Sequence, residues 1–174
     1  MKKIFNLSVI LLIMLLVVTG CNKNEKATIT ENYTKKDMEE LLENFYKDIE
    51  GLPMLNTTEV DLESSDMIKN ATGLTSSKGI DMILLSEPVI NAQAHSVVLI
   101  KTNKDANMEN MKKEILNNID MRKWICVGAE QLYVTNYDSV IIVIMTDEQL
   151  AKKVLSNFKT ATNDNFGSVL DKNS

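Results

Sequence analysis

Residue types that build many catalytic and metal sites are scarce in this chain of 174 residues. His95 is its single histidine, so no second histidine exists to complete the usual zinc ligand sets. Only six glycines are present, and they form no phosphate-binding loop. A nucleophile elbow and an HExxH motif are also missing from the sequence. The common hydrolase, nucleotide-binding and zinc-enzyme classes therefore lack a starting motif, and we expect no enzyme, no metal and no cofactor.

Long apolar runs are absent too, except in the first 21 residues. Two lysines precede ten consecutive apolar residues at 9–18, and two small residues, Thr19 and Gly20, follow. This run is too short for a transmembrane helix, which needs about 20 apolar residues, but it fits the about 7 to 15 of a secretory signal. We interpret residues 1–20 as a lipoprotein signal peptide, with an uncleaved anchor or an ordinary signal peptide as the alternative.

The end of this signal, Val18-Thr19-Gly20-Cys21, resembles the lipobox of bacterial lipoproteins, with valine in place of the commoner leucine. The resemblance implies cleavage between Gly20 and Cys21 and attachment of diacylglycerol to Cys21. Two acyl chains anchor a protein stably, whereas one chain holds it only marginally. We therefore expect a lipid-anchored protein on the extracytoplasmic face of the cell membrane. Residues 21–33 would be the lipidated cysteine and a polar tether.

Basic residues are outnumbered by acidic ones. Once Lys2 and Lys3 leave with the signal, 17 of the 19 basic residues remain against 24 acidic ones, a formal net charge of −7. Nucleic-acid-binding proteins show clustered Lys and Arg, so this balance argues against a nucleic-acid partner. Abundant Ile, Lys and Asn beside a single arginine, Arg122, are typical of an AT-rich genome, so we expect a Gram-positive source.

About 154 residues remain after cleavage, which is the size of one domain. Apolar periodicity and turn residues predict its elements, with 34–160 as a single domain and 161–174 as a disordered tail. Helices are predicted at 35–49, 66–71, after Asp105 through Ile119, and after Thr146 through Phe158. Their predicted starts are a capping box at Thr34 with Asp37, a cap at Asp105 and a capping box at Thr146 with Gln149. Strands are predicted at 80–85, 94–102, 131–135 and 140–145, and the turn residues at 136–139 predict that the last two form a hairpin. The stretch 52–65 is predicted to be irregular.

Two stretches share the order strand, strand, helix. Residues 96–100 lead to Thr102 and a helix, as 139–143 lead to Thr146 and a helix. This ββαββα order is a circular permutation of the split βαβ sandwich. It predicts an α+β fold with a four-stranded, mainly antiparallel sheet and helices on one face, preceded by an N-terminal helix. Amphipathic patterns alone would also make two strand–helix units look alike, and that alternative stays open.

The order of elements from Leu41 through Phe158 resembles a bacterial family. A leading helix, Leu52-Pro53-Met54, a short helix before Gly73, the strand at Ile80, a Ser-Val-Val-Leu strand and a closing strand and helix follow one another. The domain-of-unknown-function 4358 lipoproteins of clostridia and their relatives look similar. The resemblance covers most of the processed chain and implies an envelope location. It carries over no catalytic or binding residue.

Two single residues are candidates for chemistry. His95 lies at the start of a predicted strand without a histidine partner, so we expect a structural or merely exposed side chain. Cys126 has no CxxC partner and, since Cys21 is committed to lipid, closes no disulfide within the domain. Apolar neighbours at 124–127 predict a buried, inert thiol, with an intermolecular disulfide as the alternative.

Acidic and amide residues after the second strand have the spacing of a calcium-binding loop. This spacing is shared by Asn103, Asp105, Asn107, Glu109 and Glu114. The sixth loop position needs glycine but is Met108, so we interpret the stretch as a capped amphipathic helix. The eight methionines left after cleavage have helix and strand spacing, which predicts core packing and not a copper site.

These observations favour a binding or interaction module for another envelope component, a protein or a wall polymer, over an enzyme. The expected binding surface is the face of the sheet that helices leave uncovered. The alternative is a small envelope hydrolase whose carboxylates are brought together by the fold.

Overall fold

The computed structural model describes residues 33–90 and 92–174. The predicted signal, its cleavage site at Gly20 and Cys21, and nearly all of the tether lie outside these residues. Among the residues described, no helix is both long and apolar enough to cross a membrane. The elements, in chain order, are α2 (Lys35–Tyr46), β1 (Leu55–Glu59), α3 (Ser65–Thr72), β2 (Ile80–Pro88), β3 (Ser96–Thr102), α4 (Met108–Asn118), β4 (Gln131–Tyr137), β5 (Val140–Thr146), α5 (Glu148–Ala161) and β6 (Leu170–Asn173).

The strands form one antiparallel sheet in the order β1-β2-β3-β5-β4-β6. The predicted mixture of helices with an antiparallel sheet is confirmed, and the four predicted strands are its four middle strands. The prediction of a four-stranded sheet is confirmed in part, because β1 and β6 extend the four predicted strands at the two edges. The predicted β4–β5 hairpin is confirmed, with a two-residue turn in which Asp138 has a positive φ of 48°.

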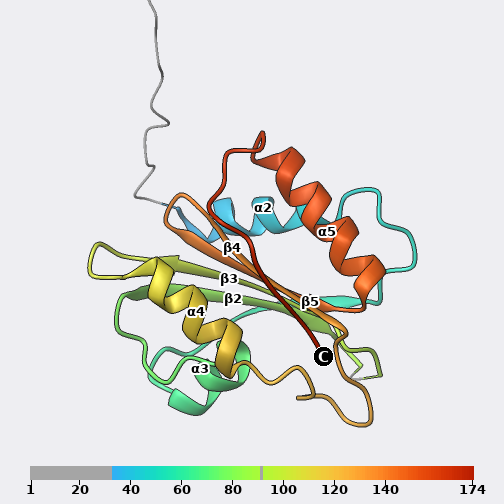
Figure 1. Cartoon of the computed structure of the whole chain (residues 1–174), viewed down its shortest axis with the longest axis horizontal. Coiled ribbons are helices and arrows are strands. Elements are labelled where there is room, and N and C mark those ends of the chain that lie inside the picture. The colour runs from blue at the N-terminus through green and yellow to red at the C-terminus, as the bar shows by residue number, and fades with distance from the viewer. Residues whose placement is uncertain (1–32, 91) are drawn as a thin grey trace, which may run out of the picture.

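Two crossovers place helices on both faces of the sheet. α4 connects β3 to the parallel strand β4, and α5 connects β5 to the parallel strand β6. Each crossover passes one strand in the same direction across the sheet, but β3 and β5 run antiparallel. Because such crossovers are right-handed, these two must lie on opposite faces. The prediction of helices on one face is therefore wrong: α2 and α5 cover one face, and α3 and α4 the other (Figure 1).

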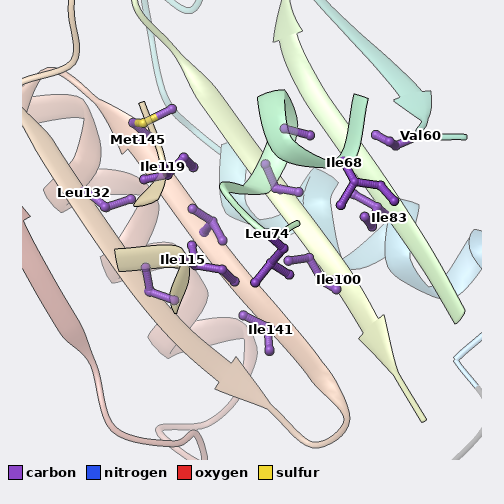
Figure 2. Close-up of a cluster of buried hydrophobic side chains, with 14 of the residues drawn as sticks. Val60, Ile68, Leu74, Ile83, Ile100, Ile115, Ile119, Leu132, Ile141 and Met145 are labelled. Atoms are coloured by element: carbon purple, nitrogen blue, oxygen red, sulfur yellow. The ribbon is translucent and has the colours of Figure 1, made fainter. Parts of the chain in front are cut away.

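The central strands are buried on both faces. In β5, Ile141 and Val143 belong to the core under α3 and α4, whereas Ile142 and Ile144 belong to the core under α2 and α5. Strands that are covered on both faces have continuous apolar sequences, so β3 and β5 were easy to predict. Figure 2 shows the first of these cores, with Ile115 among its labelled side chains.

The second core joins α2 to α5. The rings of Phe45 and Phe158 meet edge to face with their centroids 5.4 Å apart. Asn157 Nδ2 donates to the carbonyl of Phe45 at 3.0 Å and to that of Lys47 at 2.8 Å. These bonds satisfy carbonyls at the C-terminal end of α2, which lack partners within the helix. α2 therefore ends at Tyr46, before the predicted end at residue 49.

The helix starts were predicted to within a few residues. Thr34 and the third helical residue of α2 form the predicted capping box. α4 is capped by Asn107 and not by Asp105, and α5 by Asp147 and not by Thr146. Capping residue types stand next to each other at both places, so the pattern locates the helix without fixing its first residue.

Neither edge strand was predicted. β1 lies in the stretch expected to be irregular, and β6 lies in 161–174, which was expected to be disordered. Both expectations are wrong because β1 pairs with β2 and β6 pairs with β4 through their backbones. Edge strands with mostly polar, exposed residues carry no alternating apolar pattern, so the sequence gives little sign of them.

Candidate functional site

A groove of about 740 Å³ lies at the end of the sheet where β2 begins and where β3 and β4 end. Its volume falls within the about 300–1,000 Å³ of small-molecule sites. In Figure 1 this is the end that carries the β3–α4 connection and the β4–β5 turn. We call it the strand-end groove. Its lining residues are Asp81, Thr102, Asn103, Lys104, Ala106, Met108, Asn136, Asp138, Ser139, Asn165, Phe166 and Gly167.

Hydrogen bonds between residues far apart in the chain hold the middle of the strand-end groove together. The backbone N and the Oγ1 of Thr102 both donate to the carbonyl of Ser139, at 2.8 and 2.7 Å. Asn103 Nδ2 donates to Asp81 Oδ1 at 3.0 Å, and Lys101 Nζ lies 3.9 Å from Asp81 Oδ2. These bonds join the ends of β2 and β3 to the β4–β5 turn, so the polar groups of the groove are pre-positioned.

The segment 165–168 forms one wall of the groove by packing against β4. Gly167 N donates to the carbonyl of Asn136 at 2.8 Å, and Thr135 Oγ1 donates to the carbonyl of Gly167 at 3.2 Å. A Cβ atom at Gly167 would collide with Asn136 Oδ1. The position therefore needs glycine for a close approach, although its φ is not positive.

Lys112 of α4 binds both this wall and β4 through its ammonium group. Its side chain is 0 % exposed, and its Nζ donates to Asn136 Oδ1 at 2.9 Å and to Ser168 Oγ at 3.0 Å. Glu109 Oε1 lies 2.7 Å from the same Nζ. A buried ammonium group needs such partners because removing it from water is costly. No local motif marks Lys112, since these partners of the wall lie 24 and 56 residues away in the chain.

The strand-end groove lies beside the first residue that the structure describes. Tyr33 OH donates to Asp138 Oδ2 at 3.3 Å, and its ring meets that of Tyr137 edge to face at 6.4 Å. Burial raises the pKa of Tyr33 above its usual range, so the hydroxyl remains a donor. The chain that leads from the N-terminus therefore joins the folded part at the rim of the groove.

Two carboxylates line the strand-end groove. The side chain of Asp81 is 43 % exposed and accepts from Asn103, while Asp138 is half-buried and accepts from Tyr33. Over residues 33–90 and 92–174, no three His, Cys, Asp or Glu side chains gather to hold a metal ion. Ser139 Oγ is buried and has no hydrogen-bond partner among the described residues. The arrangement can hydrogen-bond a polar ligand from several sides.

His95, a sequence candidate, lies far from this groove at the other end of β3. It is 1 % exposed, so the merely exposed alternative is wrong. Tyr46 OH lies 3.1 Å from both His95 Nε2 and Ser86 Oγ, which ties α2 to the sheet. Burial lowers the pKa of His95 to about 4, and the nearby Asp147 charge opposes this shift. The residue is a neutral, buried member of a core hydrogen-bond network.

Cys126 is exposed, so the prediction of a buried thiol is wrong. Its φ of 63° is a turn conformation, and the segment around it is a loop between α4 and β4. In this loop Trp124 is 7 % exposed while Ile125 is 76 % exposed. Neighbouring apolar residues therefore point in different directions, and their composition misled the prediction.

The remaining sequence candidates behave as parts of the fold. Asn107 caps α4, and Asn103 Oδ1 accepts from Asp105 N at 3.0 Å, so this stretch is the predicted capped helix and the turn before it. Core packing is confirmed for Met38, Met121 and Met145, among others. It is wrong for two methionines at 54 and 67, which are exposed.

Comparison with protein-family models, curated proteins and solved structures finds no match for this chain. The resemblance to the domain-of-unknown-function 4358 lipoproteins therefore stays a prediction. Lipidation of Cys21 and cleavage after Gly20 lie outside the described residues and stay predictions too. The strand-end groove includes Asn136, Asn165 and Gly167, which the sequence did not single out as site residues.

Proposed function

We propose that this chain is a lipid-anchored protein of the extracytoplasmic membrane face whose folded part binds another envelope component, a protein or a wall polymer. The strand-end groove is the observation that carries the binding role. It combines a volume of about 740 Å³ with polar groups that internal bonds hold in position. The lipobox-like sequence ending at Cys21 supports the anchor.

The groove replaces the binding surface expected from the sequence. An uncovered sheet face was expected to bind the partner, but helices cover both faces. The ends of strands and their connections remain available, and loops held by a rigid sheet commonly carry binding sites. The hydrogen bond from Tyr33 to Asp138 puts the groove next to the segment that leads to Cys21.

This placement supports a ligand close to the membrane. Twelve residues lead from Cys21 to Tyr33, and a chain of this length spans at most about 43 Å. A lipid on Cys21 would therefore keep the groove within that distance of the bilayer surface. The groove would meet membrane-proximal components of the envelope before distant ones.

A hydrolase is the second candidate because Asp81 and Asp138 line the same groove. General acid–base chemistry would use one of them as an acid and the other as a base. Asp81 is partly exposed and bonded to Asn103, and Asp138 is bonded to Tyr33, so these bonds favour a positioning role. Binding without turnover is therefore the function we prefer.

The order of the four middle strands also supports part of the predicted fold relationship. β2-β3-β5-β4 is the order that a circular permutation of a split βαβ unit produces. We propose that β2, β3, α4, β4 and β5 follow the arrangement of such a unit, whereas α5, which lies on the other face and leads to β6, departs from it.

Photo-crosslinking in living cells tests the binding role. A photoreactive amino acid replaces Asn165 in the groove or, as a control, exposed Asn117 on α4, in the full-length chain. The account expects a recurrent adduct from position 165 that is missing from position 117. Equal adducts from both positions contradict it. Hydrolysis of a wall or ester substrate that Asp81→Asn or Asp138→Asn abolishes would establish the hydrolase instead.

A further inference from the structure

If the strand-end groove has the proposed binding function, its lining residues indicate the chemical class of the ligand. We propose that the groove binds a neutral saccharide segment that carries hydroxyl and amide groups. Three independent features of the groove carry this proposal: its charge, its hydrogen-bonding groups and its apolar lining. Each restricts the ligand in a different way.

Charge excludes strongly charged ligands. Asp81, Asp138 and Lys104 all line the groove, and the chain has a formal net charge of −5 before any processing. A phosphate-rich polymer would be repelled by the two carboxylates, and the single exposed lysine cannot neutralise the charge of its phosphates. A strongly basic ligand would find Asp81 already close to Lys101. A neutral ligand avoids both penalties.

Hydrogen-bonding capacity favours a ligand that both donates and accepts. Asn165 offers an amide with both functions, and no hydrogen bond of its side chain to another described residue is present. Asp138 uses only one carboxylate oxygen, Oδ2, for Tyr33. Hydroxyl groups suit this mixture, because each one can donate to Asp138 and accept from Asn165.

Apolar side chains lie among these polar groups. Phe166, Ala106 and Met108 contribute carbon surface to the lining. The ring of Phe166 packs on Phe158 with the centroids 5.2 Å apart, so its position is fixed by the core. Sugar rings combine hydroxyl edges with C–H faces, and an aromatic ring with a negative face attracts such C–H groups. Inorganic ions and small polar metabolites do not use such a surface.

The wall of the groove is also held in one position. Lys112 and Gly167 fix the wall that carries Asn165 and Phe166, through bonds to Ser168 and Asn136. A groove held in one shape loses less freedom when a ligand binds. Neutral saccharides are well hydrated and offer no strong ionic contact, so they need pre-positioned partners that replace the hydrogen bonds to water.

The test is a titration of the full-length chain, purified in detergent, followed by backbone amide NMR. The probe is the neutral trisaccharide of N-acetylglucosamine, with polyphosphate and trilysine as charged comparisons. We expect the trisaccharide to shift resonances of residues 102–106, 136–139 and 165–167. The variant Asn165→Ala should weaken its binding about fivefold, the loss of one hydrogen bond. Asn117→Ala, on the exposed surface of α4, should leave it unchanged.

Two results overturn the saccharide assignment. One is the absence of groove shifts with the trisaccharide at millimolar concentration, and the other is equal weakening by the groove variant and by Asn117→Ala. Crosslinking from position 165 then shows separately whether the groove binds a different ligand. Failure of the saccharide assignment and failure of the binding function are therefore distinguishable.

Discussion

Replacing the buried ammonium group of Lys112 should destabilise the protein by releasing the groove wall. Its side chain is 0 % exposed and contacts Asn136, Ser168 and Glu109. Lys112→Met keeps most of the apolar stem but removes the donor. The next residue along α4, Lys113, is exposed, so Lys113→Met provides a matched control with the same chemical change.

The expected loss can be worked out from these contacts. Asn136 Oδ1, on a half-buried residue, loses its donor at a cost of about 1–3 kcal/mol. Ser168 is exposed, so its Oγ can bond to water instead and adds little. Glu109 has a side chain 59 % exposed, so it rehydrates and adds little. Removing a buried charge also recovers some desolvation energy. We expect a net destabilisation of about 1–2 kcal/mol for Lys112→Met, against less than about 0.5 kcal/mol for the control.

Urea unfolding of the two full-length variants measures this difference. The free energy of unfolding should fall for Lys112→Met without a change in slope, because the same surface is exposed on unfolding. Equal stability of Lys112→Met and Lys113→Met would refute the reasoning. In that case apolar packing, not the ammonium group, would hold the 165–168 wall in place.

Three further predictions concern the anchor and the core. Cys21→Ala should release the chain into the soluble fraction, and sedimentation of the variant with membranes in high salt would contradict lipid anchoring. Val143→Asp buries an unpaired charge at a site that is 0 % exposed, so thermal melts should show a larger loss than for His95→Ala, which removes one network member. Below pH 6.5 His95 becomes protonated in the unfolded chain but stays neutral in the folded chain, where its pKa is lowered to about 4. The free energy of unfolding should therefore fall between pH 6.5 and 4, relative to His95→Gln, by up to about 3 kcal/mol, and a parallel pH dependence of the two proteins would contradict a buried neutral histidine.

The sequence predicted the interior of this fold better than its edges. β3 and β5 are apolar on both faces, so their position could be read directly. β1 and β6 are held by backbone pairing with β2 and β4, which depends on partners far away in the chain. The side of the sheet on which α5 lies depends on β6, because the crossover leads to that strand. Missing β6 therefore also led to the wrong placement of the helices.

The groove could not be predicted for a similar reason. Its members come from β2, the β3–α4 connection, the β4–β5 turn and the segment 165–167. Each of these stretches looks like an ordinary polar turn in the sequence. Gly167 and Lys112 become informative only when Asn136 is placed beside them. The isolated candidates, His95 and Cys126, attracted attention because their residue types are rare, and neither lies in the groove.

Hydrogen exchange in isolated cell envelopes tests the central claim most directly. The full-length chain is compared in envelopes and after purification in detergent, with exchange followed at residues 136–139 and 165–167 of the groove. Helix α5 away from the groove, at 148–157, serves as the internal control. The account predicts slower exchange of the groove segments in the envelopes and unchanged exchange in the control. Equal exchange of the groove segments in both preparations would contradict a groove that binds an envelope component.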